Sequence, residues 1–195
     1  STDVRLQHTF TRGRHALVWG GNYRWNNSRL TSLVASGLDP VERDITLAAI
    51  FAQDQIALTP DFTVTLGAKL EDDSFTGTAF LPSLRFGWRP GGRDLIWGAV
   101  SRAVRTPSRI DRDLSLPGFL EPADFQSEAL TAYELGYRAR PNERLSVSIS
   151  AFYNEYEKLR TVSFAPGGGL PLRFTNLGEG HRWGGEAWGT FDVNE

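Results

Sequence analysis

Between Phe62 and Glu71 the chain reads FTVTLGAKLE, a stretch in which apolar and polar residues alternate. The apolar positions are Phe62, Val64, Leu66, Ala68 and Leu70. Successive side chains of a β-strand point to opposite faces, so this pattern predicts a strand with one apolar face and one polar face.

The same alternation recurs along most of the chain. It is clear in residues 82–89, 133–140 and 145–151. It is weaker in residues 4–10, 15–25, 43–58, 94–103 and 171–193. The sequence therefore predicts about nine strands, many of them near the ~9–11 residues that cross a bilayer at a tilt.

Two of these regions also fit a helix. Residues 127–135 have a serine N-cap followed by good helix formers, and residues 45–58 are rich in Ala, Leu and Gln. The alternation of the neighbouring segments favours strand in both.

The connections between the predicted strands differ in length. Tight links with turn residues fall at 12–14, 60–61, 90–93 and 141–143, and longer links at 26–42, 72–79, 103–126 and 165–170. Short and long links alternate, which places the short ones at one end of the sheet. Short turns at one end and long loops at the other are typical of outer-membrane barrels. We therefore predict an all-β fold, an antiparallel up-and-down meander of about nine strands in a transmembrane β-barrel.

The aromatic residues suggest a membrane interface. Trp88 and Trp97 flank the tight link at 90–93, and Tyr137 precedes the next one. Rings at these positions fit an aromatic girdle, and Trp19, Tyr23 and Trp25 fit the opposite rim. The alternative is that Trp88 and Trp97 form a cross-strand pair in an ordinary core.

Composition excludes several classes of protein. The 195 residues include no Cys and no Met, and 21 basic residues against 23 acidic ones give a net charge of −2. A nucleic-acid partner is not expected, because no basic block is present.

We predict no catalytic residues, no cofactor and no metal site. A hydrolase would need His15 or His181 beside a serine. Because the chain opens on Ser1 without any Met, we expect it to be excised from a longer protein.

Several short motifs occur in a fixed order. They are FAQDQ at 51–55, PSLRF at 82–86, SRAVRTPS at 101–108, YELGYR at 133–138, FYNEY at 152–156, NLG at 176–178 and GGE at 184–186. In this succession the chain resembles the barrel of TonB-dependent receptors of the Gram-negative outer membrane. The resemblance covers nearly the whole chain, from about Arg5 onward.

The resemblance implies both a place and a role for the chain. The nine-strand meander, residues 1–195, would be an interior part of a large transmembrane β-barrel domain, without the signal peptide, the plug or the C-terminal strands. The parent would be an outer-membrane receptor that imports a scarce ligand such as a ferric siderophore, and not an enzyme. Its partners would be the TonB complex, reached through the plug, a small-molecule ligand such as a metal chelate, and outer-membrane lipid.

Two sets of residues are candidates for this role. Ligand recognition in the family belongs to the extracellular loops and upper lumen, where charged and aromatic side chains could grip an anionic chelate. Here the candidates are Arg105, Arg109, Arg112, Phe119 and Phe125. A solvated loop has the same composition, which is the alternative. Strand parity predicts a second set that faces the lumen, namely Arg85, Arg102, Glu134 and Arg138. Such charges could form ion pairs with one another or with the plug, because buried charges need partners, and the alternative is contact with the ligand.

A second function remains open at this point. A soluble antiparallel β-sandwich or small barrel could present Trp and Tyr to a sugar or a protein partner. Such a fold would bury the apolar stripe against a second sheet, whereas a membrane barrel would expose it as an outward band. The stripe consists of Phe62, Val64, Leu66, Leu84, Phe86 and Trp88.

Overall fold

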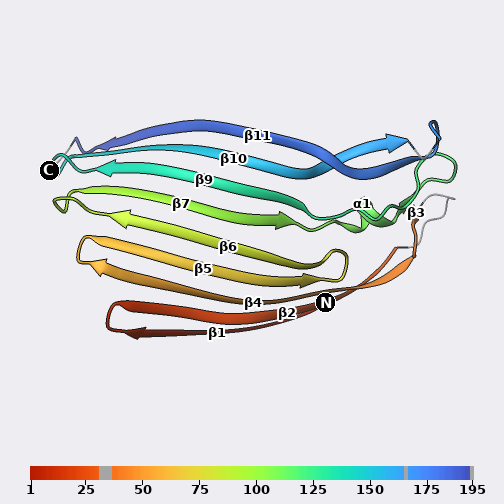
Figure 1. Cartoon of the computed structure of the whole chain (residues 1–195), viewed down its shortest axis with the longest axis horizontal. Coiled ribbons are helices and arrows are strands. Elements are labelled where there is room, and N and C mark those ends of the chain that lie inside the picture. Colours follow the sequence, from red (N-terminus) through yellow and green to blue (C-terminus); the bar gives the residue numbers. More distant parts are fainter. Residues whose placement is uncertain (31–36, 165–166, 194–195) are drawn as a thin grey trace.

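The computed structural model describes residues 1–30, 37–164 and 167–193. Nine strands form one curved antiparallel sheet in chain order, β1-β2-β4-β5-β6-β7-β9-β10-β11 (Figure 1). The predicted meander is confirmed. The strands of this sheet are β1 (Thr2–Arg12), β2 (His15–Arg29), β4 (Glu42–Thr59), β5 (Phe62–Asp73), β6 (Gly77–Trp88), β7 (Asp94–Arg105), β9 (Glu128–Ala139), β10 (Leu145–Phe164) and β11 (Leu172–Phe191). A short helix, α1 (Arg109–Asp113), and a small pair of strands, β3 (Gly37–Leu38) and β8 (Leu114–Ser115), complete the described elements.

Both segments with helical propensity are strands. β4 pairs with β2 on one side and β5 on the other, and β9 lies between β7 and β10. Hydrogen bonds from two neighbours outweigh a local preference of a few tenths of a kcal/mol per residue. The described residues contain no helix that is both long and apolar enough to cross a membrane.

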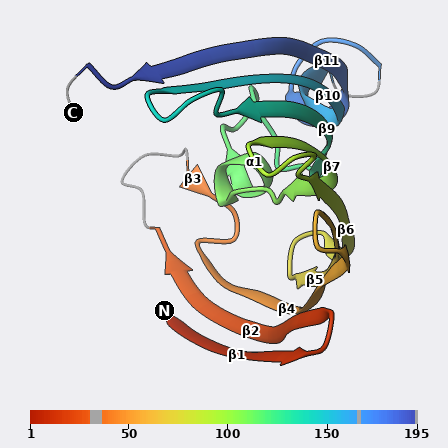
Figure 2. The same ribbon diagram turned by 90° about the vertical axis from the view of Figure 1, so that its left-hand side faces the viewer.

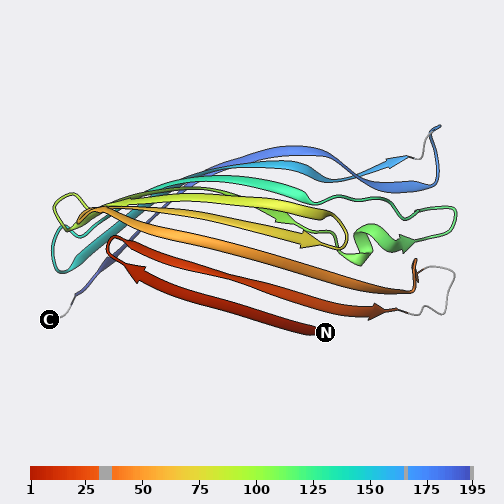
Figure 3. The same ribbon diagram turned by 60° about the horizontal axis from the view of Figure 1, so that its bottom comes forward.

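Link lengths agree with the prediction at three of the four positions on the loop end (Figure 3). The exception is the link predicted at 72–79, which is a turn of only three residues, 74–76. The polar residues on either side belong to the strands, since Thr78 donates to Asp72 Oδ1 at 2.8 Å, and Asp73 Oδ1 accepts from the Phe75 amide. The prediction of a long link at 72–79 is wrong, because polar residues at strand ends have the composition of a loop. Parts of the predicted links 26–42 and 165–170, namely 31–36 and 165–166, lie outside the described residues.

The sheet has two distinct faces. The register pairs Phe62 with Trp88 and Leu66 with Leu84, which puts the predicted stripe on one face, here called the outward face. Leu66 is 50% exposed, Leu84 42% and Trp88 45%. The other face, here called the concave face, lies on the side of α1 and β3 (Figure 2). Among the described residues no second sheet covers the outward face, so the β-sandwich alternative is wrong.

The aromatic residues divide between the two faces. Trp88 and Tyr137 are exposed on the outward face near the turn end, in line with a girdle. Trp97 points to the concave face instead, where it covers Gly136: a Cβ on this glycine would lie 2.3 Å from the ring. The indole therefore packs against bare backbone and does not belong to the girdle.

Candidate functional site

Residues 106–127, here called the inner loop, connect β7 to β9 and turn back over the concave face (Figure 2). Backbone contacts hold the segment at several points. Leu114 of β8 pairs with Leu38 of β3, and Leu120 bridges to Leu172 at the start of β11. The inner loop is therefore docked onto the sheet at the end where the long connections lie.

The helix at the start of the inner loop has a local sequence cause. Ser108 is its N-cap, and the Ser108 hydroxyl accepts from the backbone N–H of Asp111 while the Asp111 side chain accepts from the backbone N–H of Ser108. This capping box satisfies donors that would otherwise be unpaired at a helix start. The same exchange turns the carboxylate of Asp111 back toward β7.

Arg109 and Asp113 fix α1 to the strands beneath it. Arg109 Nε donates to Asp113 Oδ2 at 2.9 Å, and its two Nη atoms donate to the carbonyl oxygens of Ser28, Pro40 and Val41. Asp113 also pairs with Arg43 of β4 at 2.9 Å. Both side chains of the Arg109–Asp113 pair are buried. Arg109, which the sequence predicted to bind ligand, therefore donates its hydrogen bonds to groups inside the protein.

The remaining candidates in the inner loop differ in exposure. Phe125 is fully buried, whereas Phe119 is half exposed. Arg112 donates to the Phe75 carbonyl oxygen and to Asp124 Oδ1, and its guanidinium lies 5.5 Å from the centre of the Phe75 ring. Arg112 and Phe125 hold the loop in place, and Phe119 is left at the surface.

A cluster of charges joins the inner loop to β7, β9 and β10. Asp111 accepts from Arg160 Nη1 at 2.8 Å and from Arg105 Nη1 at 3.3 Å. Glu128 accepts from Arg105 Nε at 2.6 Å and from the backbone N–H of Arg160 at 2.8 Å. The side chain of Asp111 is 2% exposed, against 50% for Arg105 and 49% for Arg160. An incoming molecule therefore meets the guanidinium groups, and the Asp111 carboxylate lies behind them.

The ionised state of Asp111 is favoured by its surroundings. Burial opposes ionisation, but hydrogen bonds from Ser108 and Arg160 and the charge of Arg105 outweigh it, so the pKa of Asp111 lies below its ordinary value. The lowered pKa means that the folded protein binds this proton more weakly than the unfolded chain does. The interaction therefore stabilises the docked loop above the unfolded pKa of about 3.9 and is lost as the pH falls through the folded value.

Acidification is expected to loosen the inner loop. Hydrogen exchange of its amides, corrected for the intrinsic effect of pH, should accelerate as the pH drops below about 4, because protonated Asp111 no longer pairs with Arg105 and Arg160. Asp111→Asn should exchange faster already at pH 7 and should respond less to acid. The same acid response in the parent and in Asp111→Asn would show that other groups govern the docking.

Three of the four residues predicted to face the lumen lie on the concave face. Arg85 and Glu134 both have Ala99 as Cα partner, which places them in one row across β6, β7 and β9. Arg138 belongs to the same face and its guanidinium lies 5.6 Å from the centre of the Trp188 ring.

Arg102 lies on the opposite face, contrary to the prediction. It follows Val100, the Cα partner of Leu84, by two residues, and it pairs with Glu157 at 3.4 Å. The parity of β7 was ambiguous because Leu95, Ile96 and Trp97 are consecutive apolar residues. Arg102 is therefore a charged residue of the outward face.

The histidines do not assemble a catalytic group with serine in the described structure. His15 Nδ1 lies 2.7 Å from Asp54 Oδ2, and the ring of His181 stacks on Tyr153 at 6.2 Å. Neither has a serine hydroxyl as a hydrogen-bond partner among the described residues. Those residues also contain no group of three or more His, Asp or Glu side chains placed to hold a metal ion.

Comparison with known proteins agrees with this architecture. The family model described as "TonB dependent receptor-like, beta-barrel" matches residues 1–194. The siderophore receptor PirA of Acinetobacter baumannii is 18% identical with a TM-score of 0.78, over 98% of this chain and 34% of that one. PirA of Pseudomonas aeruginosa is 19% identical with a TM-score of 0.79, over 95% and 36%.

A third solved structure comes from another receptor of P. aeruginosa. A mutant of the ferric enterobactin receptor PfeA in complex with enterobactin is 18% identical with a TM-score of 0.77, over 95% of this chain and 32% of that one. The chain thus spans about a third of the length of these structures. The similarities establish the fold, and the neighbours are described as receptors.

Proposed function

Because this chain belongs to the TonB-dependent receptor-like β-barrel family, whose barrels lie in the outer membrane of Gram-negative bacteria, we propose that it serves in siderophore uptake. It forms part of a receptor that binds a ferric siderophore at the loop end of the concave face. Import is energised through the TonB complex, which contacts the plug region of the receptor. The exposed outward face meets outer-membrane lipid.

The pair Arg105 and Arg160 carries this proposal. Each guanidinium is anchored by Asp111 or Glu128 yet remains half exposed at the loop end of the concave face. Guanidinium groups with spare N–H donors suit the oxygen atoms of an anionic iron chelate. The sequence does not mark Arg160 as a candidate, because the alternation of β10 does not distinguish a ligand-binding arginine from one that only faces solvent.

The ligand-binding set is revised accordingly. Arg105 and Phe119 remain proposed contacts, and Arg160 joins them. Arg109, Arg112 and Phe125 become positioning residues that hold the inner loop, since their side chains are engaged or buried within the protein.

Removing one guanidinium is expected to weaken chelate binding. Arg105→Gln and Arg160→Gln should each reduce the affinity for ferric enterobactin about tenfold, the effect of losing one charge-assisted hydrogen bond. The probe is chosen because PfeA binds enterobactin. Affinity is measured by fluorescence titration of the protein purified from the outer membrane.

Arg89→Gln is the matched control, because Arg89 lies in the link after β6 at the turn end. It should bind like the parent. Hydrogen exchange of the inner loop separates lost contacts from a displaced loop. Equal affinity in all three variants, or a parent that binds only a neutral ferric hydroxamate, would refute the anionic-chelate proposal.

A further inference from the structure

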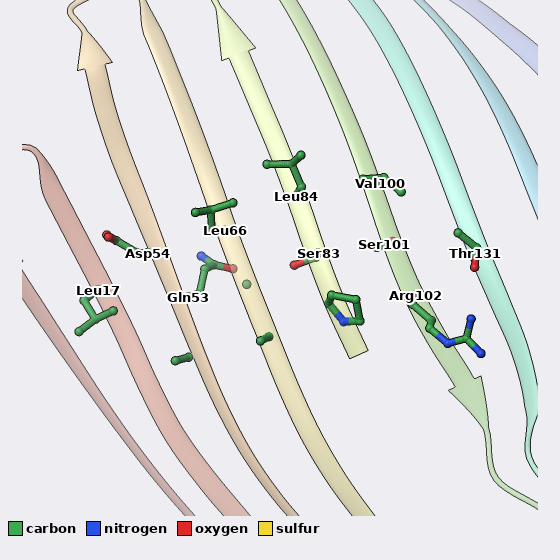
Figure 4. A pocket seen from close by; sticks show the side chains of 14 residues that line it. Leu17, Gln53, Asp54, Leu66, Ser83, Leu84, Val100, Ser101, Arg102 and Thr131 are labelled. Carbon is green, nitrogen blue, oxygen red and sulfur yellow. The ribbon is translucent and has the colours of Figure 1, made fainter. Parts of the chain in front are cut away.

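The outward face carries a groove of about 620 Å³ that crosses the middle of the sheet (Figure 4). Its floor consists of small residues that are neighbours in the register, since Ala68 has Ala52 as its partner on β4 and Pro82 on β6. Larger apolar side chains rise on both sides of this row. The ridge toward the turn end includes Leu66 and Leu84. The ridge toward the loop end consists of Ile50, Leu70 and Phe80, which are exposed.

The groove runs obliquely through the apolar band. At one side it begins at Leu17, close to the turn-end start of β2 at His15, and at the other it reaches Arg102, close to the loop-end terminus of β7 at Arg105. Figure 4 shows Leu17 and Arg102 at opposite sides of the row of lining residues. The groove therefore rises from the turn side of the membrane to the loop side.

Its two ends differ in charge. Near Leu17 the carboxylate of Asp54 is hydrogen-bonded to His15, at 2.7 Å. At the other end Arg102 has one ion pair among the described residues, the 3.4 Å contact with Glu157, and both side chains are partly exposed. A guanidinium has five N–H donors, so most of those of Arg102 are available to a further acceptor.

We propose that this groove is a binding site for a lipid with an anionic headgroup. One acyl chain lies along the floor formed by Ala52, Ala68 and Pro82, and the phosphate of the headgroup accepts hydrogen bonds from Arg102. Barrels of this kind carry their longer loops on the extracellular side, so the headgroup lies at the end of the groove that faces the outer surface. Small residues between apolar ridges give the chain a place to pack, and a basic side chain at headgroup level supplies the matching charge.

The proposal predicts opposite effects of two neighbouring substitutions. Arg102→Gln should weaken binding of dioleoylphosphatidylglycerol about fivefold, because one positive charge near the headgroup is lost. Glu157→Gln should strengthen it, because the guanidinium is released from a competing carboxylate. Ala68→Leu should weaken it about tenfold by filling the floor of the groove. Native mass spectrometry of the protein, delipidated in a zwitterionic detergent and titrated with this lipid, measures all three.

Ala151→Leu is the control for added bulk, because Ala151 lies on the outward face of β10 outside the groove. It should bind the lipid like the parent, and inorganic phosphate should not displace the lipid. Unchanged binding in Arg102→Gln or in Ala68→Leu would overturn the proposal. So would displacement by phosphate, or equal binding of dioleoylphosphatidylcholine. Because Glu157→Gln is expected to gain affinity, misfolding of a variant does not reproduce the full pattern.

Discussion

Asp113→Ala is expected to release the inner loop from the concave face. The substitution leaves the buried guanidinium of Arg109 without its carboxylate and removes the partner of Arg43. Breaking a buried ion pair from one side costs about 3–5 kcal/mol. Protection of the inner-loop amides against hydrogen exchange should therefore fall roughly a hundredfold or more, measured on the protein purified from the outer membrane.

The matched control is Asp124→Ala in the same loop. Asp124 pairs with Arg112, but its side chain is largely exposed, so its loss should change protection less than about fivefold. Amides in the middle of β5 and β6 should keep their protection in both variants. Equal effects of Asp113→Ala and Asp124→Ala would mean that the buried pair is not what docks the loop.

Much of the fold follows from alternation alone. β5 and β6 are recognisable because one face of each is largely apolar, as is typical of barrel strands that face lipid. β7 is harder, since Trp97 adds an apolar residue to the concave face and obscures its parity. The turn at 74–76 was missed because strands that extend beyond a membrane become polar on both faces, and alternation then carries no signal.

The site was less predictable than the fold. Residues 103–126 are rich in arginine and phenylalanine, as the sequence shows. Composition does not distinguish a buried arginine that holds the inner loop from an exposed arginine that could contact a ligand. Arg109 and Arg105 differ only in what surrounds them after folding. Arg109 meets backbone carbonyl oxygens and the buried carboxylate of Asp113, whereas Arg105 meets carboxylates and open solvent. Arg160 is far from the loop in sequence and reaches Asp111 only because β10 extends past β9.

Leu66→Arg is expected to destabilise the protein in a bilayer by about 2–4 kcal/mol, the cost of an arginine near the midplane on the lipid face of a barrel. Leu66 lies in the central part of β5 on the outward face and is half exposed. The free energy of unfolding is measured by guanidinium titration of the protein reconstituted in phosphatidylcholine vesicles. In a detergent micelle, where water reaches the side chain more easily, the loss should be smaller.

Ser101→Arg provides the contrast on the other face. Ser101 pairs with Ser83 and Ala132 on the concave face. The charged residues Arg85 and Glu134 lie on the same face nearby, so the surroundings of Ser101 are already polar. The same side chain there should cost less than about 1 kcal/mol. If instead both arginines cost the same, the two faces would not differ in polarity. The difference between the two costs therefore reports mainly the difference in polarity between the faces, because both substitutions place the same arginine side chain within a strand.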